Sequence, residues 1–154
     1  MKVPLTIADH LERAEVVYGR RTVLLDEPDQ PATPWAPLTA ATMAERARGQ
    51  AAALDRLGVA QGERVAIVSQ NSARLLTAFW GVSAYGRVLV PVNFRLAADE
   101  IRYIVDHCGA QMVLVDPELD EHVGDLDVAH RFVLGAESDE VLYQPGVEPQ
   151  SWAG

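Results

Sequence analysis

The sequence predicts an α/β fold in which a mostly parallel sheet carries helices on both faces. Three short apolar stretches lack the alternation of a half-exposed strand, as is typical of strands buried on both sides: residues 65–68, 88–92 and 112–115. Stretches with apolar residues at helical spacing separate them, and the connections are short. Because strands and helices alternate along the chain, a parallel sheet with crossover helices is favoured.

The chain before residue 37 is expected to form a helix, a short strand and a loop. Thr6 followed three residues later by Asp9 is an N-cap signal, and apolar residues recur at helical spacing until Gly19. Residues 22–26 are rich in strand-forming residues. Prolines crowd the stretch that follows, and since proline has no amide donor we predict a surface loop over residues 27–36.

Three further helices are expected around the buried strands. Thr39 is suited to begin a long alanine-rich helix, and Gly58 is suited to follow its end in the left-handed conformation. Ser72 is the expected N-cap of a helix over residues 73–85. Another helix is predicted over residues 99–107, between the second and third buried strands.

The signal for regular structure weakens after the third buried strand. Residues 131–134 could add one more strand, whereas the stretch after them is acidic and contains two prolines. We therefore divide the chain into an α/β portion, residues 1–135, and an acidic proline-containing tail or linker, residues 136–154. Acids and bases balance up to residue 115, so residues 116–154 carry the whole net charge of −9.

The composition excludes several classes of protein. A chain of 154 residues with 49% hydrophobic residues is long enough to bury the core of one domain. Its single cysteine excludes an intramolecular disulfide framework and a thiolate zinc site. The excess of acids argues against nucleic-acid binding, and no apolar run approaches the roughly 20 residues that cross a bilayer. Since a signal-peptide pattern is also lacking, we expect a soluble cytoplasmic protein.

The two common glycine-rich phosphate motifs, G-x-G-x-x-G and G-x-x-x-x-G-K-[ST], do not occur. The turn after the first buried strand, residues 69–72, nonetheless lies where open parallel sheets commonly bind ligands. Asn71 could help to bind an anion there. The favoured interpretation is that Asn71 fixes the turn through its own side chain.

Other reactive side chains are interpreted as structural. His107 and Cys108 are neighbours on a helix and point about 100° apart, so they do not form a pair of nucleophile and base. His122 and His130 stand among acids at irregular spacing, for which a solvated surface is favoured over a metal site. The acidic pair 99–100 suits the first turn of a helix. We expect no catalytic residue and no metal ligand within the chain.

Arg95 is the strongest candidate for contact with a ligand. It follows the second buried strand by three residues, within the sequence Pro-Val-Asn-Phe-Arg-Leu of residues 91–96. A planar guanidinium beyond the carboxyl end of a strand is well placed to meet an anion such as a phosphate. A surface ion pair with Asp99 or Glu100 is an equally good interpretation of these residues taken alone.

Several segments together resemble the start of the adenylate-forming acyl-CoA synthetases, the superfamily that includes fatty-acyl-CoA ligases, luciferases and peptide-synthetase adenylation domains. The similar segments, in the order of the family, are residues 38–57, 58–71, 84–86, 91–96, 99–104 and 110–116, so that the resemblance covers nearly all of residues 5–135. Gly-x-x-x-Gly-Glu-Arg-Val and Pro-Val-Asn-x-Arg-Leu are specific in combination. The usual Thr-Tyr and Glu-Leu pairs are replaced by Thr39-Ala40 and Thr42-Met43.

The resemblance implies the first part of the large N-terminal domain of such a ligase. Family members continue with a Ser/Thr/Gly-rich phosphate loop ending in Pro-Lys, then adenine-binding and ribose-binding segments and a C-terminal domain with a catalytic lysine. None of these occurs here, and Lys2 matches neither lysine position. The implied function is that of an N-terminal fragment of an acyl-CoA synthetase of the fatty-acid type, inactive by itself.

The resemblance also implies the ligands of the complete enzyme. ATP and Mg²⁺ would serve the activation of a carboxylic acid to acyl-AMP, and CoA would serve thioester formation; none is expected to bind the fragment tightly. Arg95 would contact the 3′-phosphate of CoA, and the remainder of the ligase domain would be the partner of the fragment. A homo-oligomer is left open. The alternative is a stand-alone interaction or scaffold module that keeps the fold without the active site.

Overall fold

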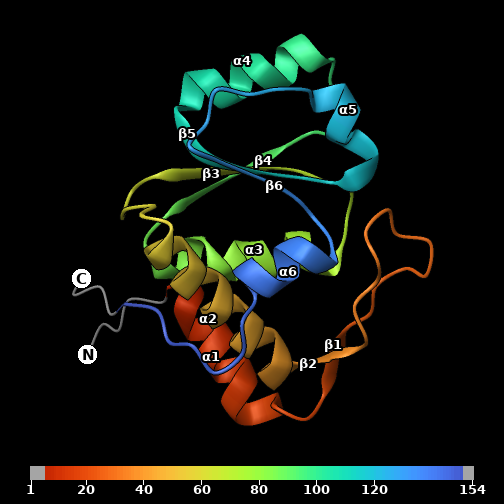
Figure 1. Ribbon diagram of the computed structural model, residues 1–154. Coiled ribbons are helices and arrows are strands. Elements are labelled where there is room, and N and C mark those ends of the chain that lie inside the picture. Colours follow the sequence, from red (N-terminus) through yellow and green to blue (C-terminus); the bar gives the residue numbers. More distant parts are fainter. Residues whose placement is uncertain (1–5, 151–154) are drawn as a thin grey trace.

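The computed structural model describes residues 6–150. Its helices are α1 (Ile7–Tyr18), α2 (Ala40–Arg56), α3 (Ala73–Gly81), α4 (Ala98–Cys108), α5 (Asp120–Val123) and α6 (Ala136–Leu142), with the 3-10 turns η1 (Ser83–Tyr85) and η2 (Pro117–Leu119). Its strands are β1 (Thr22–Leu24), β2 (Leu38–Thr39), β3 (Arg64–Val68), β4 (Val88–Val92), β5 (Ala110–Val115) and β6 (His130–Val133). Figure 1 shows the helices arranged on either side of one main sheet.

The main sheet is parallel and has the strand order β4-β3-β5-β6 (Figure 1). The register pairs Val68 with Val92 on one side and with Val115 on the other, so the carboxyl ends of three strands meet at one edge. The three strands predicted from their apolar runs are confirmed, and the weaker signal near residue 131 belongs to β6. Since the chain adds β4 on one side of β3 and β5 on the other, the switch point of the sheet lies between β3 and β5.

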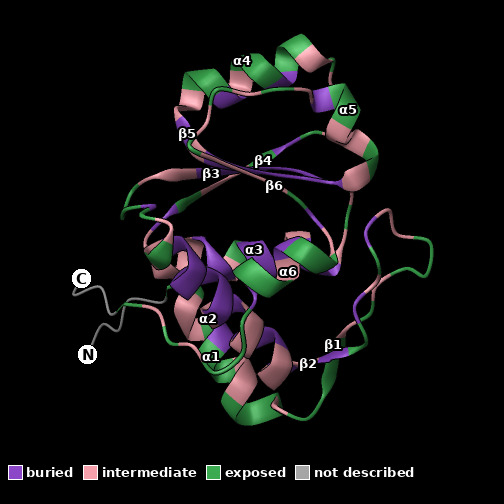
Figure 2. Cartoon of the chain, in the orientation of Figure 1, coloured by how far each residue is buried: buried purple, intermediate pink, exposed green. Residues whose placement is uncertain are grey.

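Helices cover both faces of this sheet, as the sequence predicts. α4 and α5 lie on one face, and α2, α3 and α6 lie on the other, with α1 packed against α2 (Figure 1). Alternate residues of β3 divide between the two layers: Val65 and Ile67 belong to the core beneath α2, α3 and α6, whereas Ala66 and Val68 belong to the core beneath α4 and α5. Burial on both sides explains why the strand shows no polar alternation (Figure 2).

The two N-terminal helices begin as predicted. Thr6 and Asp9 form a reciprocal capping box at the start of α1, and Thr39 Oγ1 accepts a hydrogen bond from Thr42 N at 3.2 Å at the start of α2. The antiparallel pair β1–β2 joins the two helices at the end away from the main sheet (Figure 1). None of the helices within residues 6–150 is both long and apolar enough to cross a membrane.

The structure corrects the predicted helix over residues 73–85. α3 ends at Gly81, and the chain tightens into η1 before Gly86, which has a φ of 82°. Gly81 lies against the buried Gln50 of α2, and a β-carbon on Gly81 would be 2.2 Å from Gln50 Oε1. The close approach of α2 and α3 therefore requires a glycine here, and glycine is a poor helix former.

The prediction of an irregular tail is wrong over α6, which lies beside α3 on the same face of the sheet (Figure 1). Leu142 and Tyr143 are buried in the main core, and Ser138 is buried as well. A helix of seven residues has only about two turns, too few for apolar residues to recur at helical spacing in the sequence. Its acids also made the segment look like a solvated loop. The division of the chain at residue 135 stays a prediction.

Candidate functional site

The switch point between β3 and β5 is closed by one acid. Asp116, the residue after β5, is buried, and its Oδ2 accepts hydrogen bonds from Ser69 Oγ at 2.9 Å and from Gln70 N at 2.7 Å. Burial raises the pKa of this carboxyl despite the two donors. Ligands of open parallel sheets usually bind at the switch point, but here the Asp116 side chain occupies it. The candidate site of this chain therefore lies elsewhere along the same edge.

The amino end of α3 is likewise occupied by side chains of the protein itself. Asp26 Oδ1 accepts a hydrogen bond from Ala73 N at 2.6 Å, and Ser72 Oγ accepts one from Leu75 N at 3.1 Å. A carboxylate thus fills the place that an external anion would take at a helix N-terminus. The favoured interpretation of Asn71 was wrong, because within the described residues only its backbone carbonyl accepts a hydrogen bond. Ser72 and Asp26 hold the turn instead.

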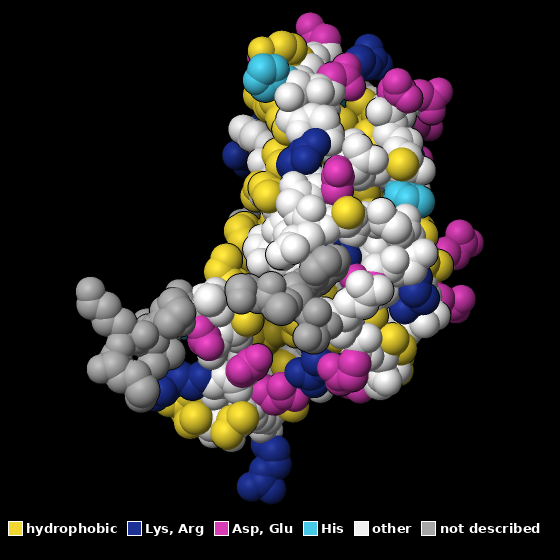
Figure 3. Space-filling view, turned by 90° about the vertical axis from the view of Figure 1, so that its left-hand side faces the viewer, with side chains coloured by type: hydrophobic (Ala, Val, Ile, Leu, Met, Phe, Trp, Pro, Cys, Tyr) yellow, Lys and Arg dark blue, Asp and Glu magenta, His cyan; other side chains and the backbone are white. Residues whose placement is uncertain are grey.

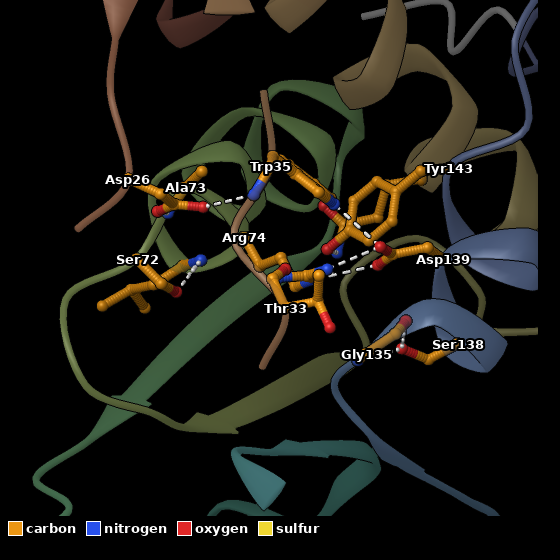
Figure 4. Close-up of polar contacts among 12 residues, drawn as sticks. Asp26, Thr33, Trp35, Ser72, Ala73, Arg74, Gly135, Ser138, Asp139 and Tyr143 are labelled. Carbon is orange, nitrogen blue, oxygen red and sulfur yellow. Dashed lines mark hydrogen bonds and ion pairs between the residues drawn. The ribbon is translucent and has the colours of Figure 1, made fainter. Parts of the chain in front are cut away.

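A buried ion pair anchors the proline-rich loop that precedes β2 (Figure 4). Arg74 of α3 is 2% exposed, and it donates from Nε to Asp139 Oδ1 at 2.9 Å and from Nη2 to Asp139 Oδ2 at 2.6 Å. Nη1 donates to the carbonyl oxygen of Thr33 at 3.0 Å. One guanidinium therefore joins α3, α6 and the loop.

Trp35 at the end of the loop completes the same network (Figure 4). Its indole Nε1 donates to Asp139 Oδ2 at 2.7 Å, and its backbone N donates to Asp26 Oδ2 at 3.0 Å. Tyr143 meets the indole edge-on with ring centroids 4.8 Å apart, and the Arg46 guanidinium lies 3.9 Å from the indole centroid. Burial raises the pKa of the Tyr143 phenol. The loop predicted from its prolines is confirmed, and both of its ends are held by side chains.

The anchored loop forms one wall of an open groove beside Arg95. The groove has a volume of about 500 Å³ and is lined by residues from the β4–α4 connection, from the turn after β3 and from the loop: Phe94, Arg95, Gln70, Asn71, Glu27, Asp29, Gln30 and Pro31. The guanidinium carbon of Arg95 lies 4.9 Å from the centroid of the Phe94 ring. This stacking favours a guanidinium that stays next to the groove.

Arg95 is not paired with either acid at the start of α4. Within the described residues it forms no ion pair, and Glu100 accepts a hydrogen bond from Ala97 N at 2.9 Å instead. The donors of the Arg95 guanidinium are therefore available to a ligand. Glu27 and Asp29 line the same groove, so its charge is mixed and an anion would be bound mainly through Arg95.

The histidines and the cysteine are distributed over separate contacts. His122 and His130 each place Nε2 next to a backbone carbonyl, at 2.9 and 2.8 Å respectively. His107 stacks on the Tyr103 ring with centroids 5.4 Å apart, and the Cys108 thiol donates to the carbonyl three residues earlier at 3.3 Å. Over residues 6–150 no group of three or more side chains is arranged to hold a metal ion.

Sequence and fold agree on a relationship to known proteins. The family model for AMP-binding enzymes matches residues 11–152. The chain belongs to this family. It is 36% identical over 140 residues to a long-chain-fatty-acid–CoA ligase of Thermus thermophilus, and 30% identical over 145 residues to a medium-chain-fatty-acid–CoA ligase of Ectopseudomonas oleovorans. These matches cover 87% and 90% of the chain but 25% and 26% of the relatives, so this AMP-binding chain spans about a quarter of their length.

The structural comparison identifies which part of an AMP-binding enzyme this is. The crystal structure of the N-terminal domain of FACL13 from Mycobacterium tuberculosis superimposes with a TM-score of 0.77 at 28% identity, over 98% of this chain and 39% of that one. The resemblance to acyl-CoA synthetases and the predicted fold class are thereby confirmed.

The acids that hold the site together were not found from the sequence. Asp26, Asp116 and Asp139 each bind at least one group that lies 46 to 65 residues away in the chain, and no local pattern marks such pairs. The one available signal was Arg74, a base among the apolar residues of α3, because a buried base requires a counter-charge.

Proposed function

We propose that this chain is the opening portion of an acyl-CoA synthetase of the fatty-acid type. The observation that carries the proposal is the match of residues 11–152 to the AMP-binding enzymes, together with the long-chain and medium-chain fatty-acid ligases among the relatives. The chain would supply the sheet and helices on which the rest of the N-terminal domain is built. We place the protein in the cytoplasm, where ATP and CoA are available.

The complete enzyme would act in two steps. A carboxylate attacks the α-phosphorus of ATP, which gives acyl-AMP and releases pyrophosphate, and the thiol of CoA then displaces AMP to give the thioester. Mg²⁺ would neutralise part of the phosphate charge. Residues 6–150 contain no lysine, and their carboxylates form no metal-binding group, so ATP and Mg²⁺ would be held by other residues of the enzyme. The 154-residue chain alone is then inactive.

Arg95 is the residue of this chain that we assign to a ligand. Its unpaired guanidinium at the groove beyond β4 would donate charge-assisted hydrogen bonds to the 3′-phosphate of CoA. Arg95→Gln is expected to raise the KM for CoA about ten- to a hundred-fold, since such bonds contribute about 1.5–3 kcal/mol, while acyl-AMP formation is unchanged. Glu27→Gln with Asp29→Asn is the matched control and should lower that KM. An unchanged KM for CoA in Arg95→Gln would contradict the assignment.

The alternative is a stand-alone interaction or scaffold module. It is favoured by two observations: Asp116 closes the switch point, and Asp26 occupies the amino end of α3. A module of this kind would bind a partner protein and catalyse no reaction.

One experiment distinguishes the two functions. The product of the complete reading frame that contains this sequence is assayed for pyrophosphate release with short- to long-chain fatty acids and with benzoate, with and without CoA. The 154-residue chain is assayed in parallel. Fatty-acid-dependent pyrophosphate release by the complete product and none by the 154-residue chain are expected. A complete product without pyrophosphate release on any acid would overturn the ligase proposal and favour the module.

A further inference from the structure

The turn that carries Arg95 is stabilised from within by an asparagine. Residues 93–96 connect β4 to α4, and Leu96 N donates to the backbone carbonyl of Asn93 at 3.2 Å. Asn93 Oδ1 also accepts a hydrogen bond from Arg95 N at 3.0 Å. An asparagine side chain that binds the amide two residues later is typical of a tight turn. The backbone of Arg95 is therefore held from the side of β4.

His122 of α5 binds the other end of this turn. Its Nε2 lies 2.9 Å from the carbonyl oxygen of Leu96, the residue next to Arg95. A carbonyl oxygen can only accept a hydrogen bond, so Nε2 carries a proton and donates. The two residues are 26 positions apart in the chain, and α5 lies beside the start of α4 (Figure 1). The bond therefore joins two separate elements at the base of the Arg95 turn.

α5 is short, but the core and the sheet hold it in place. Val123 is 0% exposed and belongs to the core beneath α4. Arg131 of β6 donates from Nη2 to the carboxylate and to the backbone carbonyl of Asp120. The position of His122 is thus set by β6 and by the core, independently of the turn that it binds.

The contact of His122 is not a charge pair. Figure 3 shows acidic side chains at the end of the molecule formed by α4, and α5 itself contains Asp120 and Glu121. Within residues 6–150 His122 nevertheless forms no ion pair, and its imidazole meets a neutral backbone oxygen. Because this hydrogen bond is exposed, water can replace the imidazole at the Leu96 carbonyl. Loss of the bond should therefore affect the local turn more than the stability of the whole fold.

We propose that His122 is a positioning residue for the ligand groove beside Arg95. By fixing the carbonyl of Leu96, it would keep the turn in the conformation that presents the Arg95 guanidinium, stacked on the Phe94 ring, to the groove. Hydrogen bonds depend on direction as well as distance, and a group that is already held in place binds its ligand with a smaller loss of entropy. The inference rests on the proposed function of Arg95 and extends it to α5.

A second histidine with a similar contact provides the matched control. His130 also places Nε2 next to a backbone carbonyl, that of Leu57, at 2.8 Å. His130 begins β6, however, at the amino edge of the parallel sheet, whereas the groove lies at the carboxyl edge. His122→Leu and His130→Leu each remove one donor, and His122→Gln keeps an N–H group that can donate. Thermal unfolding followed by circular dichroism shows whether each variant is folded.

The first measurement is the KM for CoA of the complete enzyme. His122→Leu is expected to raise it about two- to ten-fold, the effect of one hydrogen bond, with CoA-independent pyrophosphate release as the reference. His122→Gln should restore the original KM, and His130→Leu should not change it. In the Arg95→Gln background His122→Leu should have no further effect, because His122 acts only through Arg95. A general loss of packing would not depend on Arg95 in this way.

The second measurement is hydrogen exchange in the 154-residue chain. Arg95 N and Leu96 N both donate within the turn, so their exchange reports directly on its opening. Exchange at these two amides should be faster in His122→Leu than in the unmodified chain, and unchanged in His122→Gln and in His130→Leu. This measurement does not depend on acyl-CoA synthesis.

Three results would overturn the role of His122 while Arg95→Gln still raises the KM for CoA. Unchanged exchange in His122→Leu would show that the imidazole does not hold the turn. An unchanged KM in His122→Leu would show that the groove needs no such support, and the same rise of KM with and without Arg95→Gln would show an effect that bypasses Arg95. If Arg95→Gln itself leaves the KM unchanged, the proposed function of Arg95 is wrong, and the role of His122 falls with it.

Discussion

Removal of the Asp139 carboxylate should destabilise the protein more than any other single substitution in α6. Arg74 is 2% exposed, and the Asp139 side chain, 19% exposed, provides the only carboxylate that it meets within residues 6–150. Asp139→Ala therefore leaves a buried guanidinium charge without its carboxylate, and it also removes the acceptor of the Trp35 indole. The loss of one partner of a buried ion pair lowers the free energy of unfolding by about 3–5 kcal/mol.

The effect is measured by thermal and urea unfolding of the 154-residue chain, followed by circular dichroism. For a chain of this size, each kcal/mol lowers Tm by about 2–4 °C, so the Tm of Asp139→Ala should fall by about 6–20 °C. Arg74→Met with Asp139→Ala removes the buried charge as well. That double variant should recover part of the loss, because an apolar side chain tolerates the site better than an unpaired guanidinium.

Either of two results would contradict a stabilising buried ion pair between Arg74 and Asp139. A Tm for Asp139→Ala within about 3 °C of the unmodified protein would mean that the pair is not the buried contact described. A double variant less stable than Asp139→Ala would mean that Arg74 stabilises the core by packing, through the stem of its side chain, and not through its charge.

Three further substitutions test the contacts of Asp26, Gly81 and Asp116. Asp26→Ala should lower the free energy of unfolding by about 1–3 kcal/mol and speed hydrogen exchange at the two backbone amides that now donate to it. Gly81→Ala should cost about 1–3 kcal/mol through overlap with Gln50, and a double variant with Gln50→Ala should show less than additive loss in urea unfolding. Asp116→Asn keeps an oxygen that can accept from Ser69 and Gln70, and it removes a carboxyl group whose pKa is raised by burial. The unmodified protein should therefore lose stability relative to this variant as the pH rises above 3.8, and Tm values that fall in parallel would contradict this.

The layers of the fold could be predicted because both faces of the sheet are covered. Val65 and Ile67 meet one layer of helices, and Ala66 and Val68 meet the other, so no polar residue interrupts the apolar run of residues 65–68 in β3. α6 could not be predicted in this way. Its position depends on Asp139 meeting Arg74, and an acid in an acidic stretch looks like part of a solvated surface until its partner is known.

The candidate site was only partly predictable, because some of its contacts join residues that are far apart in the sequence. Arg95 stands out because the order of strand, turn and helix places it at the carboxyl edge of the sheet, and this follows from nearby residues. That Asp116 closes the switch point, and that Asp26 caps α3, depends on chain segments that meet only in the folded protein. The interpretation of Asn71 was wrong because Asp116 and Asp26 accept the hydrogen bonds of the backbone amides on either side of it, those of Gln70 and Ala73.

The distance along the chain between Arg74 and Asp139 has a consequence for synthesis on the ribosome. Arg74 is translated 65 residues before its acid, an interval of about 3–13 s at about 5–20 residues per second. During this interval the nascent chain holds an unneutralised guanidinium in the layer formed by α2 and α3. That layer can close only when α6 leaves the exit tunnel, whereas β3 to β5 and α4 can assemble earlier. A translational pause before residue 139 would therefore prolong the exposure of one half of the molecule to chaperones and proteases.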